Sequence, residues 1–450
     1  MTKNLSRLLV AVLCSRLTVA AVIAAEPAPG AAPAAPVPAA KPKIIKPADM
    51  PAAGIDRILL TWAGDPATSQ SITWRTGEPS TNPLVEVAVS SANPKFGTNA
   101  VTVAAVTRPL TRSDGVTVFY HRVDLTNLTP ATIYAYRVGH GKDWSEWNQF
   151  RTAAREAQPF SFIYLGDVQT HLKPLCSRIF RAAMLKAADP RFILHLGDLV
   201  EAPEKDKLWA EWFEAAGWIF RTLPSLPVPG NHDQYGAITK TNEAVLSQYW
   251  PAQFSLPTNG PAGLEGMTYF LNYQGVLFVS LNSERDLEVQ AQWLDKVLTE
   301  NKRRSWTVVS IHATLFSSGG KRTPDAQVAL QKVFLPVIDK HKVDLVLQGH
   351  YHIYSRSHKL QGGKRVDPKA AGTVYCTSVA GSKMYPLNPA YDELMSRKGD
   401  YIQLFQIISV DGKTLRYESW SVTGDLFDSF SLVKDEAGAS ELVEGRAVKP

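Results

Sequence analysis

The chain has 450 residues, of which 45% are hydrophobic and 20% charged. At roughly 100–200 residues per domain, this length predicts two or three domains, and this composition excludes a disordered chain and a polytopic membrane protein. The formal charge of +6 falls to +3 without Lys3, Arg7 and Arg16 of a predicted leader, which excludes a basic field for nucleic acid. With three cysteines, a disulfide scaffold and a Cys-rich zinc module are also excluded.

The N-terminal segment has the pattern of an exported protein. Residues 1–25 begin with basic residues, continue through a mostly apolar stretch and end in the small residues Ala24 and Ala25, which predicts a signal peptide. Arg16 interrupts the apolar run, and no other window approaches the ~20 apolar residues of a spanning helix. We therefore expect a secreted or periplasmic protein without a transmembrane anchor. Residues 26–53, rich in Ala and Pro, predict an extended linker.

Short strand-like runs follow, separated by turn residues. They are ILLTW, SITWRT, LVEVAVS, VTVFYHRVDL, ATIYAYRVG and WNQFRT. Without an intervening helical period, such runs predict an antiparallel β-sandwich. The segment from Leu128 to Tyr134 resembles the tyrosine corner of fibronectin type III domains, where a tyrosine hydroxyl bonds to nearby backbone. We expect a fibronectin III-like domain over residues 54–154.

Past residue 158, apolar runs alternate with helix-like stretches. Apolar residues at helical spacing over Ile179–Ala188 and Leu287–Leu298 predict two helices. Strands alternating with helices predict an α/β domain with a parallel or mixed sheet over residues 158–434. Asp411-Gly412 predicts a hairpin between the last two strand-like runs. Residues 435–450 are expected to form a polar tail.

Five apolar runs of this second domain end in polar residues that bind metals or phosphate. In chain order these are Asp167, Asp198, Asn231, His312 and the pair His350 and His352. Loops at the carboxyl ends of sheet strands converge on one crevice, so these side chains are expected to meet. Oxygen and imidazole donors without thiolates suit Mn, Fe, Zn or Co. The glycines directly before Asp167, Asp198, Asn231 and His350 allow the backbone to approach such ions closely. A carboxylate between two cations holds them ~3.5–4 Å apart, which suits in-line phosphoryl displacement.

The order GD-x, GD, GNH[DE], H and GH-x-H resembles the calcineurin-like metallophosphoesterase superfamily. Within it, the preceding fibronectin-like domain and the phrases LTWAGDPATSQSITWRT, VGHGKDWSEWNQFRT and GHYHIYSRS resemble the purple acid phosphatases. The resemblance covers roughly residues 55–433. It implies a multidomain β plus α/β protein: a β-sandwich, then an α/β sandwich with two mixed β-sheets flanked by helices.

The resemblance also implies a role for each matching residue. Asp167 and His352 would hold the first metal ion, Asp198 would bridge both, and the second would be held by Asn231, His312 and His350. His232 would contact phosphate and protonate or stabilise the leaving oxygen, with Asp233 as its orienting neighbour. The implied cofactor is a pair of divalent or mixed-valence ions of Fe, Mn or Zn.

Two positions depart from the family pattern. Purple acid phosphatases place a tyrosine three residues after the bridging Asp, where this chain has Glu201. Relatives outside that subgroup use Asp-x-His at the first motif, where this chain has Gln169. The carbonyl oxygen of Gln169, the carboxylate of Glu201 or a water molecule would then complete the first metal's ligands. Without a phenolate donor, we expect a colourless enzyme that is less committed to ferric iron.

The predicted function is therefore an exported phosphatase that hydrolyses phosphate monoesters of small molecules through a dinuclear-metal-activated hydroxide. A nearby cation would favour monoesters over diesters, and Arg356 and the pair Lys321-Arg322 are the candidates. His171 is a further candidate for substrate contact.

Two alternatives stay open at this point. One is a phosphodiesterase or nucleotide pyrophosphatase with the same site. The other is a non-catalytic exported binding module with a decayed site. The chain contains no GxSxG elbow, Walker A sequence or HExxH helix that would indicate another reaction. Whether Cys176 and Cys376 pair is also open.

Overall fold

The computed structural model describes residues 54–235, 244–302, 304–319 and 324–445. The predicted signal peptide and the predicted linker up to residue 53 lie outside these residues. None of the helices among the described residues combines the length and apolar character needed to cross a membrane.

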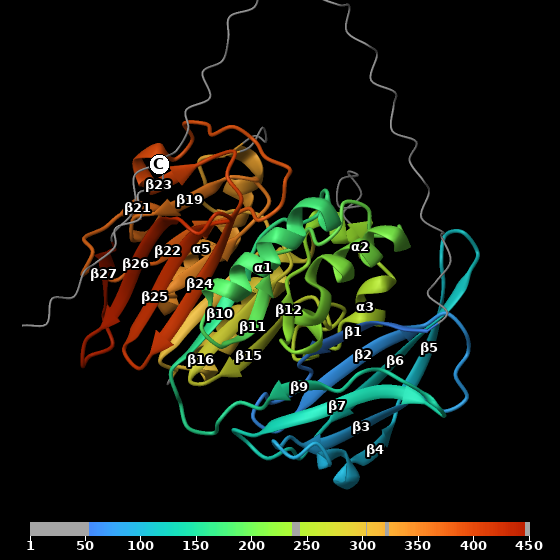
Figure 1. The fold of residues 1–450 in the computed structure, drawn as a ribbon. Helices are drawn as coiled ribbons and strands as arrows, with labels where there is room; N and C mark the ends of the chain where they lie inside the picture. Colours follow the sequence, from blue (N-terminus) through green and yellow to red (C-terminus); the bar gives the residue numbers. More distant parts are fainter. Residues whose placement is uncertain (1–53, 236–243, 303, 320–323, 446–450) are drawn as a thin grey trace, which may run out of the picture. The chain divides into compact units, whose positions relative to one another are not determined.

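The N-terminal part is formed by two antiparallel sheets (Figure 1). The first has the order β1 (Ile55–Thr61), β2 (Gln70–Thr76), β6 (Thr117–Leu125) and β5 (Val106–Thr111). The second has the order β4 (Val101–Ala104), β3 (Leu84–Val89), β7 (Ile133–His140) and β8 (Asp143–Trp144), with β9 (Asn148–Arg151) paired to β7. Buried side chains of both sheets, including Leu60, Trp74, Val85 and Tyr136, form one core. The predicted antiparallel sandwich is confirmed.

The tyrosine corner is present as a hydrogen bond. The backbone N–H of Thr129 donates to the hydroxyl of Tyr134 over 2.8 Å. This bond ties the connection before β7 to the start of that strand, which is the local contact that the sequence pattern predicts.

The second part contains two seven-stranded mixed sheets. The first has the order β12 (Ser225–Pro227), β11 (Pro190–His195), β10 (Phe160–Leu165), β24 (Leu404–Asp411), β25 (Thr414–Ser421), β26 (Leu426–Lys434) and β27 (Ser440–Glu444). The second has the order β15 (Tyr269–Tyr273), β16 (Val276–Leu281), β17 (Trp306–Ile311), β18 (Leu345–Gln348), β22 (Val374–Thr377), β19 (Tyr354–Ser357) and β23 (Met395–Gly399). Strands β10, β11 and β12 are parallel, as are β16, β17, β18 and β22. Two short hairpins pair β13 (Gln234–Tyr235) with β14 (Val245–Leu246) and β20 (Leu360–Gln361) with β21 (Lys364–Arg365).

Helices flank these sheets (Figure 1). They are α1 (Ser177–Lys186), α2 (Asp206–Ala216), α3 (Tyr249–Gln253), α4 (Leu287–Glu300) and α5 (Pro324–His341). Helices α1 and α4 confirm the two helices that apolar spacing predicts, with ends that differ by two residues. The predicted hairpin at Asp411-Gly412 is confirmed by β24 and β25, whose register pairs Asp411 with Thr414. The predicted fold class is confirmed.

Aromatic rings fill the space between the two mixed sheets. Phe162 on β10 and Phe192 on β11 stack with centroids 4.9 Å apart, and Phe278 on β16 meets each edge-on at 5.2 Å. A second apolar cluster joins β16 to α4 and α5 through residues such as Leu277, Leu294 and Phe334. Both faces of the parallel strands are thus covered, which explains why their sequences are continuous apolar runs.

The predicted loose tail is wrong for its first part. Residues Ser440–Glu444 form β27, which pairs antiparallel with β26. Leu442 is buried and its N–H donates to the carbonyl of Pro368, while the Glu444 carboxylate binds Arg356. The side chains of this short segment alternate in direction, as in any edge strand. Because most of its residues are polar, the sequence alone predicts a tail instead.

A cluster of charges joins the sandwich to the second part. Arg57 and Arg75 of the sandwich reach Asp206 at the start of α2 over 2.9 and 2.8 Å, and Arg112 reaches it over 3.4 Å. Arg57 also donates to the hydroxyl of Tyr120 over 2.8 Å. Arg57, Arg75 and Arg112 are all buried, and Asp206 is the carboxylate that they share. Arg75 also pairs with Asp56, and Arg112 with Asp114.

Candidate metal centre

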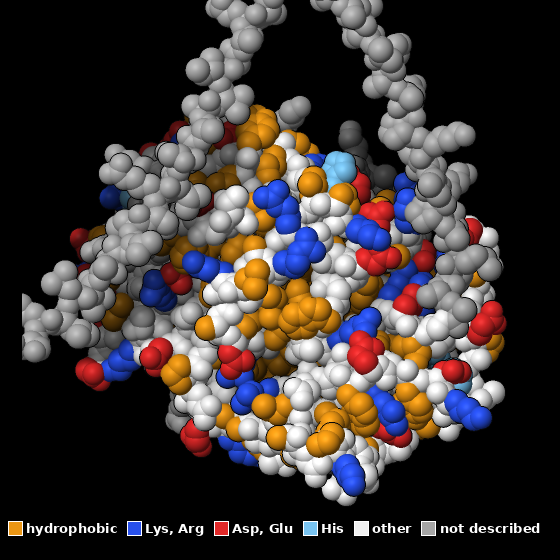
Figure 2. Space-filling view, viewed as in Figure 1, with side chains coloured by type: hydrophobic (Ala, Val, Ile, Leu, Met, Phe, Trp, Pro, Cys, Tyr) orange, Lys and Arg blue, Asp and Glu red, His pale blue; other side chains and the backbone are white. Residues whose placement is uncertain are grey.

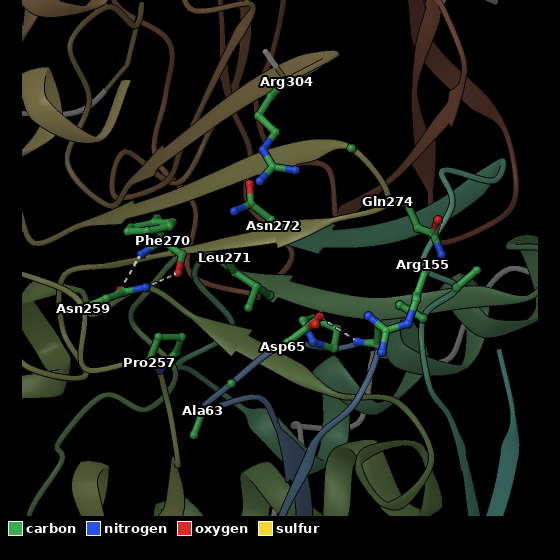
Figure 3. A pocket seen from close by; sticks show the side chains of 16 residues that line it. Ala63, Asp65, Arg155, Pro257, Asn259, Phe270, Leu271, Asn272, Gln274 and Arg304 are labelled. Carbon is green, nitrogen blue, oxygen red and sulfur yellow. Dashed lines mark hydrogen bonds between the residues drawn. The ribbon is translucent and has the colours of Figure 1, made fainter. Parts of the chain in front are cut away.

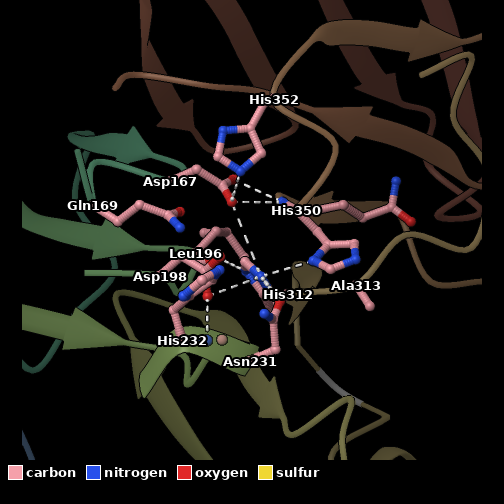
Figure 4. Close-up of polar contacts among 12 residues, drawn as sticks. Asp167, Gln169, Leu196, Asp198, Asn231, His232, His312, Ala313, His350 and His352 are labelled. Atoms are coloured by element: carbon pink, nitrogen blue, oxygen red, sulfur yellow. Dashed lines mark hydrogen bonds and ion pairs between the residues drawn. The ribbon is translucent and has the colours of Figure 1, made fainter. Parts of the chain in front are cut away.

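The six predicted metal ligands lie together where edges of the two mixed sheets meet. Asp167, Asp198 and Asn231 follow β10, β11 and β12 of the first sheet. His312 follows β17 of the second sheet, and His350 and His352 follow β18 (Figure 4). All six side chains are buried. The convergence expected from their positions at strand ends is therefore present in the structure.

These residues form two groups that share one member. Donor atoms of Asp198, His312 and His350 lie within 4.8 Å of one another, and so do donor atoms of Asp167, Asp198 and His352. Nε2 of His312 lies 3.3 Å from Oδ1 of Asp198 and 3.3 Å from Oδ1 of Asn231. Asp198 therefore has the position of a bridging ligand, and Asn231 extends the group that contains His312.

The backbone of four ligand residues is left-handed. The φ angles of Asp167, Asp198, His350 and His352 are 46°, 51°, 73° and 52°. Non-glycine residues adopt this region rarely, and such residues cluster at functional sites. Hydrogen bonds hold the loops in place: the N–H of His350 donates to Asp167 over 2.7 Å, and the N–H of His232 donates to Asp198 over 2.8 Å.

Two of the preceding glycines are required by close packing. A Cβ atom on Gly230 would lie 2.3 Å from Oδ1 of Asp198, and one on Gly349 would lie 2.5 Å from Oδ2 of Asp167. Any side chain at either position would displace a ligand carboxylate. This close approach is the role expected for these glycines from the sequence.

Backbone carbonyls orient two of the histidines. Nδ1 of His312 lies 2.6 Å from the carbonyl oxygen of Leu196, and Nδ1 of His352 lies 2.7 Å from that of Lys383. A carbonyl oxygen only accepts, so each Nδ1 carries a proton and each Nε2 faces the cluster, where a bound metal ion would take the place of any proton on it. This orientation of the ring is the one that a metal ion requires.

The buried carboxylates of the cluster shift each other's pKa. Burial, with the added charge of Asp198, raises the pKa of Asp167 to about 8. Burial opposes the ionisation of Asp198 as well, but the charge of His312 and its hydrogen bond hold the pKa of Asp198 below its usual range. Buried carboxylates that converge in this way call for cations. The donor set, its two groups and its charge fit two metal ions.

His232 lies beside this cluster, but its predicted orienting partner is wrong. Nδ1 of His232 lies 2.8 Å from the carbonyl oxygen of Glu201, which fixes the ring. The Asp233 carboxylate instead accepts backbone N–H bonds from Asp198, Leu199 and Gly230 over 2.8, 3.1 and 2.9 Å. Asp233 is adjacent in sequence but points into the loops, so it positions Asp198 and the Asn231 loop rather than the imidazole.

Gln169 and Glu201, the two candidates for a further ligand, bind each other. Nε2 of Gln169 donates to Oε2 of Glu201 over 2.8 Å, and Nζ of Lys383 lies 3.2 Å from Oε1 of Glu201. Sequence analysis missed Lys383, because it follows β22, far from every recognised motif, and no local pattern marks it.

Arg356 is not a substrate clamp, contrary to the prediction. Its Nε donates to Asp428 over 2.7 Å and its Nη2 to Glu444 over 2.7 Å. The guanidinium is buried between β19, β26 and β27, and both sides of its fork are engaged. The other predicted cations, Lys321 and Arg322, lie outside the described residues.

The remaining candidates are His171, for substrate contact, and the possible disulfide between Cys176 and Cys376. Nδ1 of His171 lies 2.9 Å from the hydroxyl of Ser382, on a loop close to Gln169. Cys176 and Cys376 are both buried and free, so they do not pair.

Two hollows differ in their relation to the cluster. A cavity of about 200 Å³ lies beside His350 and is lined by polar residues such as Ser283, Glu284 and Thr314 together with apolar residues such as Leu287 and Leu330. A pocket of about 460 Å³ is lined by residues of both parts of the chain, including Asp65, Arg155, Asn272 and Arg304 (Figure 3). None of the ligand residues lines the larger pocket, so the smaller cavity is the candidate substrate space.

Comparison with known proteins agrees with this geometry. A family model described as Purple acid Phosphatase, N-terminal domain, matches residues 55–152, and one described as Calcineurin-like phosphoesterase matches residues 160–354. An uncharacterized protein of Mycobacterium tuberculosis is 26% identical over 347 residues, covering 69% of this chain and 63% of its own length. Acid phosphatase type 7 of Danio rerio is 27% identical over 370 residues, covering 71% of this chain and 79% of its own. This chain thus spans less than two thirds of the mycobacterial relative.

Solved structures share the fold. The purple acid phosphatase PPD1 of yellow lupin has a TM-score of 0.75 at 18% identity, covering 86% of this chain and 75% of its own. PhoD has a TM-score of 0.63 at 12% identity, covering 89% of this chain and 93% of its own. The match over residues 160–354 and the order of the candidate ligands show that this part is a calcineurin-like phosphoesterase domain. The match over residues 55–152 makes the N-terminal part similar to the N-terminal domain of purple acid phosphatases.

Proposed function

We propose that the protein is an exported, metal-dependent phosphatase that hydrolyses phosphate monoesters of small molecules. The observation that carries this proposal is the place of Asp198 in both donor groups, which is the arrangement expected for a carboxylate between two cations. Relatives named acid phosphatase and purple acid phosphatase support the reaction. The proposed organisation is a signal peptide at 1–25, a linker at 26–53, a fibronectin III-like domain at 54–154 and the catalytic domain at 158–434.

The ligands divide between two positions. We assign Asp167 and His352 to the first ion, Asp198 to both, and Asn231, His312 and His350 to the second. Two bound metal ions lower the pKa of water and offset negative charge on the phosphate oxygens. Fe, Mn and Zn all suit these oxygen and imidazole donors.

His232 is the proposed general acid. Because Nδ1 is held by the carbonyl of Glu201, Nε2 is the nitrogen that can give a proton to the leaving oxygen of the ester. The hydrogen bond from its backbone N–H to Asp198 keeps this residue at a fixed position beside the shared carboxylate. Proton transfer at this point would allow an alcohol to leave in place of an alkoxide.

The cavity beside His350 supports a small substrate. Its volume of about 200 Å³ holds a small alcohol rather than a nucleic acid strand, and its polar side chains suit a hydroxylated leaving group. A diesterase or nucleotide pyrophosphatase with the same ligands is the alternative. Initial rates on p-nitrophenyl phosphate and bis(p-nitrophenyl) phosphate separate the two, and a faster diester reaction would contradict the proposed specificity.

The central test is Asp198→Asn in the mature protein. The wild type is expected to contain two metal ions per chain and to release phosphate. The variant is expected to lose metal and more than about 100-fold in kcat/KM, since even ligand-supporting residues contribute 10–100-fold. Asp114→Asn, on the exposed surface of the sandwich, is the matched control and should change neither. A wild type without metal and without turnover would favour a binding module with a decayed site.

A further inference from the structure

We propose that Gln169 binds the first metal ion through its side-chain carbonyl oxygen, and that Glu201 and Lys383 hold its amide in the orientation this requires. The donor at this position is then neutral, and the site is built for two divalent ions. The inference rests on the metal centre proposed above and specifies how one of its positions is completed.

The orientation of the Gln169 amide follows from its partner. Its Nε2 lies 2.8 Å from Oε2 of Glu201. A carboxylate accepts hydrogen bonds and an amide nitrogen donates them, so the nitrogen faces Glu201 and the oxygen faces the other way. The glutamate thus determines which end of the amide is presented to the metal cluster.

The carbonyl oxygen of Gln169 lacks a protein partner. The residue is 1% exposed, and Oε1 is buried without a hydrogen bond from any residue that the structure describes. In Figure 4 the amide end of Gln169 points toward the cluster that contains the side chain of Asp167. Burying a carbonyl oxygen without a partner is unfavourable, and a cation bound by Asp167, Asp198 and His352 would remove that penalty.

Glu201 is occupied as a support and not as a ligand. Its Oε2 accepts hydrogen bonds from Gln169 and from the hydroxyl of Thr170 over 2.8 and 3.3 Å, and its Oε1 lies 3.2 Å from Nζ of Lys383. Neither of the two metal-competent groups includes it. Lys383 also supplies the carbonyl that fixes Nδ1 of His352. Lys383 therefore holds His352 through its backbone carbonyl and Glu201 through its ammonium group.

The consequence is a lower negative charge at the first ion. Asp167 contributes one negative charge and Asp198 is shared, while His352 and Gln169 are neutral. A phenolate or carboxylate in place of the amide would add one negative charge and favour a trivalent ion. A neutral carbonyl favours Mn(II), Zn(II) or Fe(II) instead.

The test uses the full mature chain after its metal has been removed. Calorimetry measures the binding of Mn(II), and electron paramagnetic resonance then examines the Mn(II)-loaded protein. The wild type is expected to bind two Mn(II) ions with a coupled spectrum. Gln169→Ala should weaken one site by more than about tenfold, as loss of a metal-site group does, and give the spectrum of isolated Mn(II). Glu201→Gln and Lys383→Met should weaken the same site by a smaller factor. Gln149→Ala, on the sandwich surface, is the control, and thermal unfolding confirms that each variant is folded.

The outcomes separate this inference from the proposed function. A wild type that binds no Mn(II) overturns both. Two wild-type sites that are unchanged in Gln169→Ala, or weakened equally, overturn the role of Gln169 and leave the phosphatase proposal standing. Gln169→Glu should raise uptake of Fe(III) relative to Mn(II), as measured by elemental analysis after competition. A wild type that holds Fe(III) at the position lost in Gln169→Ala would overturn the divalent assignment.

Discussion

The backbone N–H of Asp198 donates a hydrogen bond of 2.8 Å to the carboxylate of Asp233. The same carboxylate accepts from Leu199 and Gly230, so it joins the loop after β11 to the loop after β12. Two of the proposed metal ligands, Asp198 and Asn231, therefore depend on one buried side chain that does not itself reach the metal.

Asp233→Asn is expected to loosen these loops. The amide nitrogen of Asn cannot accept a hydrogen bond, so at least one buried N–H loses its acceptor, which lowers the free energy of unfolding by about 1–3 kcal/mol. Metal content should fall together with kcat. Denaturant unfolding and elemental analysis measure both. A variant with unchanged stability and metal but an altered pH profile would instead support a direct role of Asp233 on His232.

His232→Ala is expected to lower kcat by about 10²–10⁴-fold while both metal ions remain bound, since general acid–base groups typically contribute that much. The loss should be larger for alkyl phosphates than for p-nitrophenyl phosphate, because an alkoxide needs the proton more. His140→Ala, in the sandwich, is the control. Equal losses on both substrates would rule out proton donation to the leaving oxygen.

Asp206→Asn should destabilise the contact between the sandwich and the second part. Arg57 and Arg75 are buried and lie within 3 Å of this carboxylate. Leaving such cations without their partner costs about 3–5 kcal/mol, whereas Glu214→Gln removes the exposed pair with Lys173 and should cost less than about 1 kcal/mol. Chemical denaturation compares them. Equal losses of unfolding free energy in the two variants would mean that the buried cluster contributes no more to stability than an exposed ion pair.

His121 makes stability sensitive to acid. Burial lowers the pKa of this imidazole to about 4, and its ring nitrogens lie 2.9 Å from the hydroxyls of Thr76 and Thr107. The folded pKa is below the ordinary value near 6.5, so its contribution is complete above pH 6.5 and is lost as the pH falls toward 4. His121→Gln should flatten this part of the stability curve, measured by denaturant midpoint at each pH. Parallel curves would contradict the prediction.

The absence of a phenolate ligand predicts a colourless protein. Glu201 occupies the position where purple relatives carry tyrosine, and it binds Gln169 and Lys383. The nearest tyrosines, Tyr351 and Tyr385, make ring contacts with His350 and His352. Iron-loaded protein should therefore lack an intense visible band. A band that disappears in Tyr351→Phe or Tyr385→Phe would contradict this.

The fold and the convergence of the candidate ligands were predictable because both depend on local patterns. Continuous apolar runs mark buried parallel strands, and the polar residue that follows each run marks the loop at its end. Asp167, Asp198 and His312 could thus be placed at one edge without knowledge of the strand order. The hairpin at Asp411-Gly412 is equally local.

The wrong or missing predictions concern side chains whose partners are distant in sequence. Arg356 meets Asp428 and Glu444, which lie 72 and 88 positions away. Glu201 and Lys383 are separated by 182 positions. A basic residue beside a metal motif has the same local pattern whether it faces substrate or a buried carboxylate. Only the pairing of β19, β26 and β27 decides between these roles.

The left-handed backbone of Asp167, Asp198, His350 and His352 restricts how this chain can change over evolutionary time. At such positions asparagine and glycine are the replacements that the main chain accepts most readily. Drift to glycine would relax the polypeptide and remove a ligand in the same step, and drift from aspartate to asparagine would remove a negative charge from the centre. Selection for folding alone would thus favour the loss of these four side chains.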